Sequence, residues 1–172
     1  LHDALPILDL ALVTLSEKRK IKSAVHITQK KTEFLNIARK INRFPVFSYL
    51  PQEDLEDIAD RLVYRHYPNG HVFFQPDEFS DRLYIIHQGE VEIIYPRHLE
   101  KPVLVLTTSD PFGELSFVIG ASHTVTAIAK TDVDIWTLRK QDFEEMLQQS
   151  PLLEESVKNF LEQPKINDYL QT

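Results

Sequence analysis

The chain has 172 residues, of which 42% are hydrophobic and 26% are charged. This composition is ordinary for a globular protein of one domain plus a flanking segment, and it excludes collagen-like, low-complexity and wholly disordered chains. There is no cysteine, which excludes a disulfide framework, a thiol nucleophile and a thiolate zinc site. The net charge of −7 disfavours nucleic acid as the main partner.

Charge divides the chain into a basic start and an acidic main body. Residues 1–43 carry a net charge of +5 and residues 44–172 one of −12. Residues 8–43 contain no glycine and space their apolar residues helically, which predicts a basic helical segment whose polar face is solvated or touches acidic lipid or a partner. The apolar run Ala4–Leu15 is too short for a complete transmembrane helix.

The chain does not begin with methionine, since the one methionine is Met146. We therefore expect a fragment, a processed product or an excised piece. The string Leu1–Ile7 resembles translated sequencing adapters, which leaves open whether these first residues are native.

A second helix is predicted within residues 44–62. Pro51 followed by the acidic Glu53 and Asp54 is typical of a helix start. An apolar stripe from Leu55 to Leu62 follows, and the turn sequence at residues 68–70 interrupts the chain.

Between residues 63 and 139 the pattern changes to that of short strands. Gly89 lies between two such strands and predicts a hairpin turn. Strands at about ten-residue spacing favour a β-sandwich, barrel or roll. The predicted strands are Val72–Gln75, Arg82–Gln88, Glu90–Tyr95, Val103–Thr107, Thr124–Thr131 and Asp134–Arg139.

Helices return over residues 140–162. Ser150 and Pro151 together indicate a capped helix start. Leu153–Leu161 then gives one apolar face, which offers a surface for a homodimer through residues 150–162. Residues 163–172 form a polar tail.

The motif Phe112–Gly120 (FGELSFVIG) stands out from this background. Its pattern predicts a strand, a glycine turn and one short helix. The glycine allows close approach of a ligand, and the helix start favours a phosphate. Glu114 would repel a phosphate but would accept a hydrogen bond from a hydroxyl. A sugar phosphate satisfies both groups, whereas a plain glycine turn with an exposed glutamate is the alternative.

Residues 44–161 resemble a cyclic nucleotide-binding domain, the β-roll of protein kinase A regulatory subunits, catabolite activator-type proteins and cyclic-nucleotide-gated channels. The resemblance implies a mainly β fold with flanking helices: a jelly-roll-like β-roll (a double-stranded β-helix) with N-terminal helices and two C-terminal helices. It places the domain at residues 44–162. The matching stretches are Phe47–Leu62, Pro68–Gly70, Asp81–Val91, Phe112–Ser116, Asp134–Trp136 and Asp142–Phe143.

The resemblance also implies a ligand site. In that family the glutamate of the phosphate-binding cassette, here Glu114, binds the ribose 2′-hydroxyl, and the glycine before it, here Gly113, lies against the ribose. The backbone amides that follow, here Leu115 and Ser116, face the cyclic phosphate. The implied ligand is cAMP or cGMP.

The sequence departs from the family at the arginine that pairs with the phosphate. His123 stands there, followed by Thr124, where the family has an arginine and then threonine or alanine. Losing a charge-assisted, forked pair costs on the order of 2–5 kcal/mol. An unperturbed histidine is mostly neutral at pH 7. Three outcomes stay open: a cyclic nucleotide, another small anion in the same pocket, or a ligand-free scaffold.

Nothing in the sequence indicates a catalytic or metal site. There is no Ser-His-Asp order, phosphate-binding Walker loop, dinucleotide fingerprint or His-x-His pair. The scattered histidines and the acidic helices are typical of solvated surfaces. The chain is therefore interpreted as a regulatory module rather than an enzyme.

In this interpretation the cyclic nucleotide is sensed in the roll, and flanking helices relay binding to an output domain outside this chain. A membrane transporter or channel with this module on its cytoplasmic side is one such arrangement. The sensor half of a transcription regulator lacking its helix-turn-helix is another, because too few residues follow Leu161 for one. No nucleic acid binding is expected within this chain, and the expected location is cytoplasmic.

Overall fold

The computed structural model describes residues 36–96, 100 and 103–164. Contacts divide the chain into two compact units, Leu1–Ile37 and Ala38–Thr172, and the second contains all the sheets. The helices predicted over residues 8–35 lie outside the described residues. Residues 36–41 are helical, as predicted, and a run of turns follows over residues 42–49.

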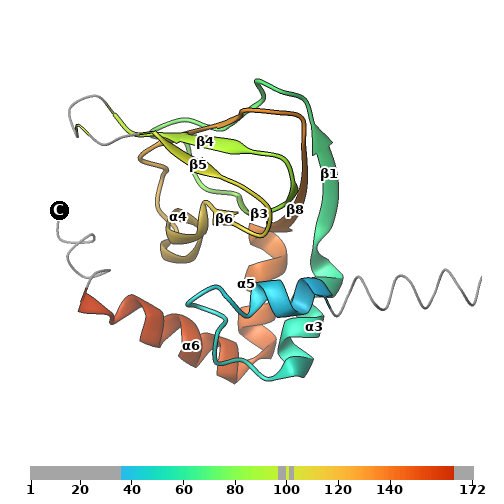
Figure 1. Ribbon diagram of the computed structural model, residues 1–172. Helices are drawn as coiled ribbons and strands as arrows, with labels where there is room; N and C mark the ends of the chain where they lie inside the picture. The colour runs from blue at the N-terminus through green and yellow to red at the C-terminus, as the bar shows by residue number, and fades with distance from the viewer. Residues whose placement is uncertain (1–35, 97–99, 101–102, 165–172) are drawn as a thin grey trace, which may run out of the picture. The chain divides into compact units, whose positions relative to one another are not determined.

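Helices flank a set of eight strands in the described part of the chain (Figure 1). After the helical residues 36–41, the order combines α3 before the strands, one short helix among them and two helices after them. The elements are α3 (Gln52–Arg61), β1 (Val63–Tyr67), β2 (Val72–Phe74), β3 (Arg82–Gln88), β4 (Val91–Ile94), β5 (Leu104–Leu106), β6 (Pro111–Phe112), α4 (Glu114–Ile119), β7 (Thr126–Ala129), β8 (Val133–Arg139), α5 (Lys140–Gln149) and α6 (Pro151–Leu161).

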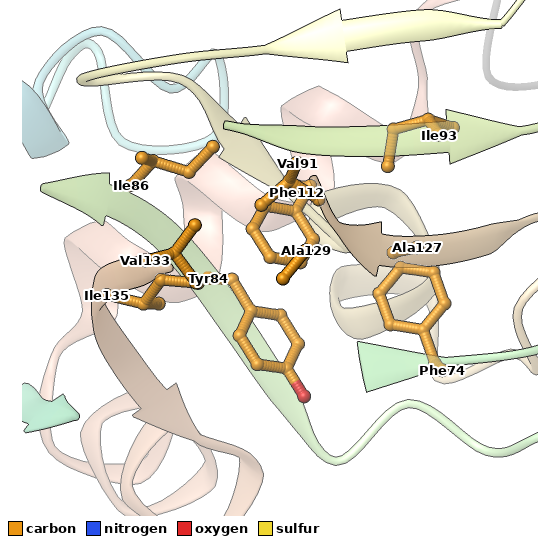
Figure 2. Close-up of a cluster of buried hydrophobic side chains, with 10 residues drawn as sticks. All are labelled: Phe74, Tyr84, Ile86, Val91, Ile93, Phe112, Ala127, Ala129, Val133 and Ile135. Atoms are coloured by element: carbon orange, nitrogen blue, oxygen red, sulfur yellow. The ribbon is translucent and has the colours of Figure 1, made fainter. Parts of the chain in front are cut away.

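The strands form two four-stranded antiparallel sheets, in the orders β1-β8-β3-β6 and β2-β7-β4-β5. Every predicted strand is present, with ends that differ by at most two residues. The inner faces of both sheets supply one buried cluster, which Figure 2 shows. Its members are Phe74, Tyr84, Ile86, Val91, Ile93, Phe112, Ala127, Ala129, Val133 and Ile135. The expected mainly β roll with flanking helices is confirmed.

The predicted hairpin at Gly89 is wrong. β3 pairs with β8 and β6, whereas β4 pairs with β7 and β5, so Gly89 carries the chain from one sheet to the other. Its φ is +103°, and a Cβ there would lie 2.5 Å from the carbonyl oxygen of Asp132. Glycine is required because another backbone turn passes beside it.

The sequence reading missed β1, whose residues are Val63–Tyr67. Its three central residues are exposed, and it pairs only with β8, at the edge of its sheet. An edge strand with Arg65 and His66 at its centre lacks the alternation that marks a half-buried strand.

The C-terminal helices follow the prediction, and the Ser150 hydroxyl accepts a hydrogen bond from the Leu153 amide at 3.2 Å. The apolar stripe that suggested a dimer is largely used within the chain, because Leu153 and Phe160 are buried. The large apolar side chain that α6 exposes is Leu152.

Candidate functional site

The glycine turn before α4 lies against the inner face of the roll. Gly113 has a φ of +77°, a conformation that glycine adopts without strain. A Cβ at this position would lie 3.5 Å from Tyr84 and 3.6 Å from Phe74. The turn therefore places the start of α4 beside two aromatic side chains of the core.

The first amides of α4 have no acceptor one turn earlier within the helix, as at every helix start. The Phe117 amide closes the first turn by donating to the Gly113 carbonyl oxygen at 3.1 Å. Leu115 is half-buried and Ser116 is buried. The predicted phosphate-facing amides thus lie at the start of the helix, directly after the glycine turn.

Glu114 holds a buried carboxyl group whose hydrogen bonding is incomplete. Its Oε1 atom is buried and has no hydrogen-bond partner among the described residues. Burial raises the pKa of Glu114 to about 7, and a hydrogen bond from the backbone amide of Val46 opposes that rise. A buried carboxyl oxygen without a donor is costly, so a ligand hydroxyl would offset a real penalty.

His123 lies inside the protein rather than at the surface. It is 4% exposed, and its ring stacks on Phe74 with centroids 3.5 Å apart and planes 5° apart. Its backbone is fixed on the loop before β3: the His123 amide donates to Glu78, and the Asp77 amide donates to His123. Thr124, the next residue, is exposed in a bend.

The surroundings of His123 keep its imidazole neutral. Burial lowers the pKa of His123, while the carboxylates of Asp81 and Glu78 oppose that shift. The same two carboxylates place negative charge beside the position where the family carries an arginine. A phosphate at this position would meet a neutral ring and acidic neighbours, which disfavours tight anion binding.

Aromatic side chains fill the interior of the roll next to the cassette (Figure 2). Tyr84 and Phe112 stack with centroids 4.7 Å apart, and Phe73 contacts both rings edge-on. Phe74 joins this group to His123. A base entering the roll here would have to pack against or displace these rings.

α4 is also held from the side of the C-terminal helices. The Lys140 ammonium group donates to the Phe117 carbonyl oxygen at 2.5 Å and lies over the rings of Phe117 and Phe143. Burial lowers the pKa of Lys140. Because α5 begins at Lys140, this contact joins the cassette helix to the first turn of α5.

Four of the predicted site residues, Gly113 to Ser116, lie together at the start of α4. The predicted site residue His123 is buried against Phe74. Sequence reasoning missed Val46, Phe74 and Lys140. Val46 acts through its backbone amide, and the Lys140 side chain binds a backbone carbonyl oxygen, so no side-chain pattern encodes either contact. Phe74 precedes a predicted loop, and only the tertiary stack with His123 reveals its part.

The described histidines and acidic residues do not assemble into a metal site. Within residues 36–96, 100 and 103–164, no group of three or more potential ligands is close enough to hold an ion. In the same residues, none of the helices combines the length and hydrophobicity needed to cross a bilayer.

Two antiparallel sheets rolled around one core, with a short helix entered through a left-handed glycine, define the class of β-roll domains with flanking helices. The family model for the cyclic nucleotide-binding domain matches residues 64–150, just over half of the chain. The chain belongs to the cyclic nucleotide-binding domain family.

Solved structures agree with this assignment. A cAMP-bound PfPKA-R structure matches with 25% identity and a TM-score of 0.60, covering 73% of this chain and 53% of that one. The N-terminal domain of a transcriptional regulator from Streptomyces coelicolor A3(2) has 24% identity and a TM-score of 0.59, covering 69% and 86%. The catabolite activator protein of Thermus thermophilus has 22% identity and a TM-score of 0.57, covering 74% and 61%.

Among curated proteins, the chain is similar to an uncharacterised NTE family protein, Rv2565, of Mycobacterium tuberculosis. The two are 26% identical over 118 residues, which is 68% of this chain and 20% of that protein. The chain therefore spans about a fifth of the length of the curated relatives it matches.

Proposed function

We propose that this chain is a regulatory module that binds a cyclic nucleotide, cAMP or cGMP, at the cassette formed by Gly113, Glu114, Leu115 and Ser116. The observation that carries the proposal is the buried Oε1 of Glu114, for which the described part of the chain supplies no donor. A ribose 2′-hydroxyl is a donor of the required kind, and the amides at the start of α4 suit a phosphate. The cAMP-bound neighbour supports this ligand class.

Affinity in this proposal is modest. His123 is buried and its pKa is lowered, so no formal positive charge meets the phosphate at that position. The missing charge-assisted pair reduces affinity by about 30-fold to several-thousand-fold relative to an arginine-bearing site. Backbone amides and Glu114 carry the binding that remains, and Thr124, which is exposed in a bend, is a further contributor in this proposal.

A ligand-free scaffold is the second candidate, and the stack of His123 on Phe74 favours it. This stack, continued by Tyr84 and Phe112, occupies space next to the cassette with protein side chains. In that case the roll would act as an interaction module whose cassette is inherited but unused.

The wider assembly belongs to the same proposal. An output domain elsewhere in a longer protein receives the signal, which is supported by the small share of the curated relatives that the chain covers. A cytoplasmic location, including the cytoplasmic side of a membrane protein, fits a nucleotide sensor. A homodimer through residues 150–162 would use Leu152 and the polar face of α6, because Leu153 and Phe160 are buried.

Isothermal titration calorimetry with cAMP and cGMP, at pH 6 and pH 7.5, tests the proposal on the wild-type chain and on His123→Arg. We expect weak binding to the wild type and at least about 30-fold tighter binding to the variant. Because the pKa of His123 is lowered, lowering the pH to 6 should add little to the wild-type affinity.

If neither protein binds either nucleotide at either pH, the sensor proposal fails and the scaffold is supported. Binding to His123→Arg alone would show that the pocket is intact and that one residue accounts for the loss of ligand.

A further inference from the structure

An exposed phenylalanine lies on the loop between β2 and β3. Phe79 is 83% exposed, although phenylalanine is among the side chains that are most often buried. Ser122 pairs with Phe79 in an antiparallel bridge, and the ring of the next residue, His123, packs inward on Phe74. Because neighbouring residues of an extended segment point to opposite sides, Phe79 faces outward. The ring of Phe79 therefore takes no part in the core of the roll.

The backbone of this loop is fixed, which holds the ring of Phe79 away from the core. Pro76 restricts one φ angle, and Asp77 adopts a left-handed φ of +71°. The Asp77 amide donates to the His123 carbonyl oxygen at 2.9 Å, and the His123 amide donates to the Glu78 carbonyl oxygen at 2.8 Å. A loop held in this way presents its side chains in one arrangement, which lowers the entropic cost of binding a partner.

Carboxylates flank Phe79 on both sides along the chain. Asp77, Glu78 and Asp81 all lie within two residues of it, and all three are exposed. Within the described residues, neither the Asp77 nor the Glu78 carboxylate forms an ion pair. The Asp81 carboxylate lies 3.8 Å from the guanidinium group of Arg82. The loop therefore combines an exposed phenyl ring with a negative surface.

Single exposed apolar side chains are common on protein surfaces, and Tyr49 is another, at 92% exposure. Phe79 differs from Tyr49 in its surroundings, since no acidic residue lies within two positions of Tyr49. An aromatic anchor with a polar rim is typical of the residues that dominate protein interfaces. The negative rim repels acidic lipids and nucleic acid phosphates and attracts cationic groups. The matching partner is a basic protein segment that offers apolar side chains to the ring.

We propose that the loop Asp77–Asp81 is a docking site for a basic segment of a protein partner. In this docking site Phe79 is the apolar anchor, and the carboxylates of Asp77 and Glu78 select a partner of positive charge. The carboxylates speed the encounter and disfavour acidic partners, whereas the ring supplies affinity. The inference goes beyond the proposed ligand and does not depend on it.

Selection from a random-sequence peptide library displayed on phage tests the docking site. The target is the whole 172-residue chain, after the library has been depleted on the Phe79→Ala variant. We expect the retained peptides to be rich in lysine and arginine and to contain apolar residues. In a fluorescence polarisation titration, Phe79→Ala should weaken binding of a retained peptide by about 30-fold or more, the effect of losing an anchor residue.

Two charge variants and one matched control accompany this titration. Asp77→Asn and Glu78→Gln should each weaken the peptide about threefold at low salt, and the difference should disappear near 1 M salt because of screening. Tyr49→Ala removes an equally exposed aromatic side chain and should leave the affinity unchanged. Because Phe79 is exposed, Phe79→Ala should unfold at the same urea concentration as the wild type, which separates lost docking from lost folding.

Three results would overturn the proposal. A library that retains no peptide after depletion would refute the docking site. Retained peptides that are acidic or uncharged would refute the basic partner, and an equal loss of affinity in Tyr49→Ala would refute the role of Phe79 as the anchor. Nucleotide calorimetry on the same chain reports on the proposed ligand separately, so failure of either proposal leaves the other standing.

Discussion

At the scale of single residues, Glu114 makes the stability of the protein depend on pH. Burial raises its pKa to about 7 in the folded chain, from the ordinary glutamate value of 4.5. The folded state therefore binds one more proton than the unfolded state between these values. Stability from this group is fully present below about pH 4.5 and is lost as the pH rises through about 7.

We expect Glu114→Gln to remove this dependence, because glutamine resembles the protonated acid and does not titrate. The wild type should lose up to about 3 kcal/mol relative to the variant between pH 4.5 and pH 8. Urea unfolding at several pH values measures the difference. Parallel curves for the two proteins would show that Glu114 is not buried as described.

His123 opposes this effect at the acid end of the range. Its pKa is lowered by burial, so protonating it costs folding free energy as the pH falls below about 6.5. Together, the titrations of Glu114 and His123 favour a free energy of unfolding that is largest below pH 7. Comparing Glu114→Gln with the wild type at each pH cancels the His123 contribution, which both proteins share.

At the scale of elements, the turn at Gly89 shows how a crossing between sheets constrains one residue. The backbone amide of the next residue, Glu90, donates a hydrogen bond to the Thr131 hydroxyl at 3.0 Å. The Lys130 amide in turn donates to the Glu90 carbonyl oxygen at 2.9 Å. These bonds hold two turns side by side: the turn between β3 and β4 and the turn between β7 and β8. Each turn carries the chain from one sheet to the other. A Cβ at Gly89 would also lie 2.7 Å from the Val133 side chain.

Gly89→Ala should therefore destabilise the fold by about 4 kcal/mol, from left-handed strain and a clash with backbone together. Gly70→Ala is the matched control: its φ is +86°, but open space surrounds it, so about 1 kcal/mol of strain is expected. Thermal or urea unfolding of both variants gives the comparison. Equal losses in the two would argue against the close approach at Gly89.

The short helix α4 contacts the flanking parts of the chain at two places. Lys140 attaches it to the start of α5, and Glu114 attaches it to the turns before α3. The helix α5 is joined to α3 as well, since Arg61 lies 3.0 Å from Glu145 and 3.8 Å from Asp142. A displacement of α4 would therefore be felt by α5 and by the run of turns together.

At the scale of the whole molecule, local sequence patterns predicted the helices and strands, whereas tertiary contacts decided how the strands pair. The strands, the capped start of α6 and the glycine-to-helix cassette follow from spacing and capping within a few residues. The pairing of β3 and β4 could not follow from Gly89, because a positive-φ glycine suits a hairpin and a sheet crossing equally.

The sequence also predicted only the local part of the candidate site. Gly113 and Glu114 are adjacent in sequence, and their placement at the start of α4 is a local matter. The stack of His123 on Phe74 joins residues 49 positions apart, and the bond from Val46 to Glu114 uses a backbone group. Neither contact is encoded in a local amino-acid pattern, although both shape the candidate site.

The central claim is that Glu114 binds the hydroxyl of a cyclic nucleotide, and calorimetry with cAMP and 2′-deoxy-cAMP tests it most directly. At pH 8 the carboxyl group is mostly ionised, given its pKa of about 7. The wild type should bind cAMP about 10-fold more tightly than the deoxy analogue or better, which is the value of a hydrogen bond to a charged group. Glu114→Ala should bind both equally weakly. A wild type that does not distinguish the two nucleotides, or that binds neither, would contradict the claim.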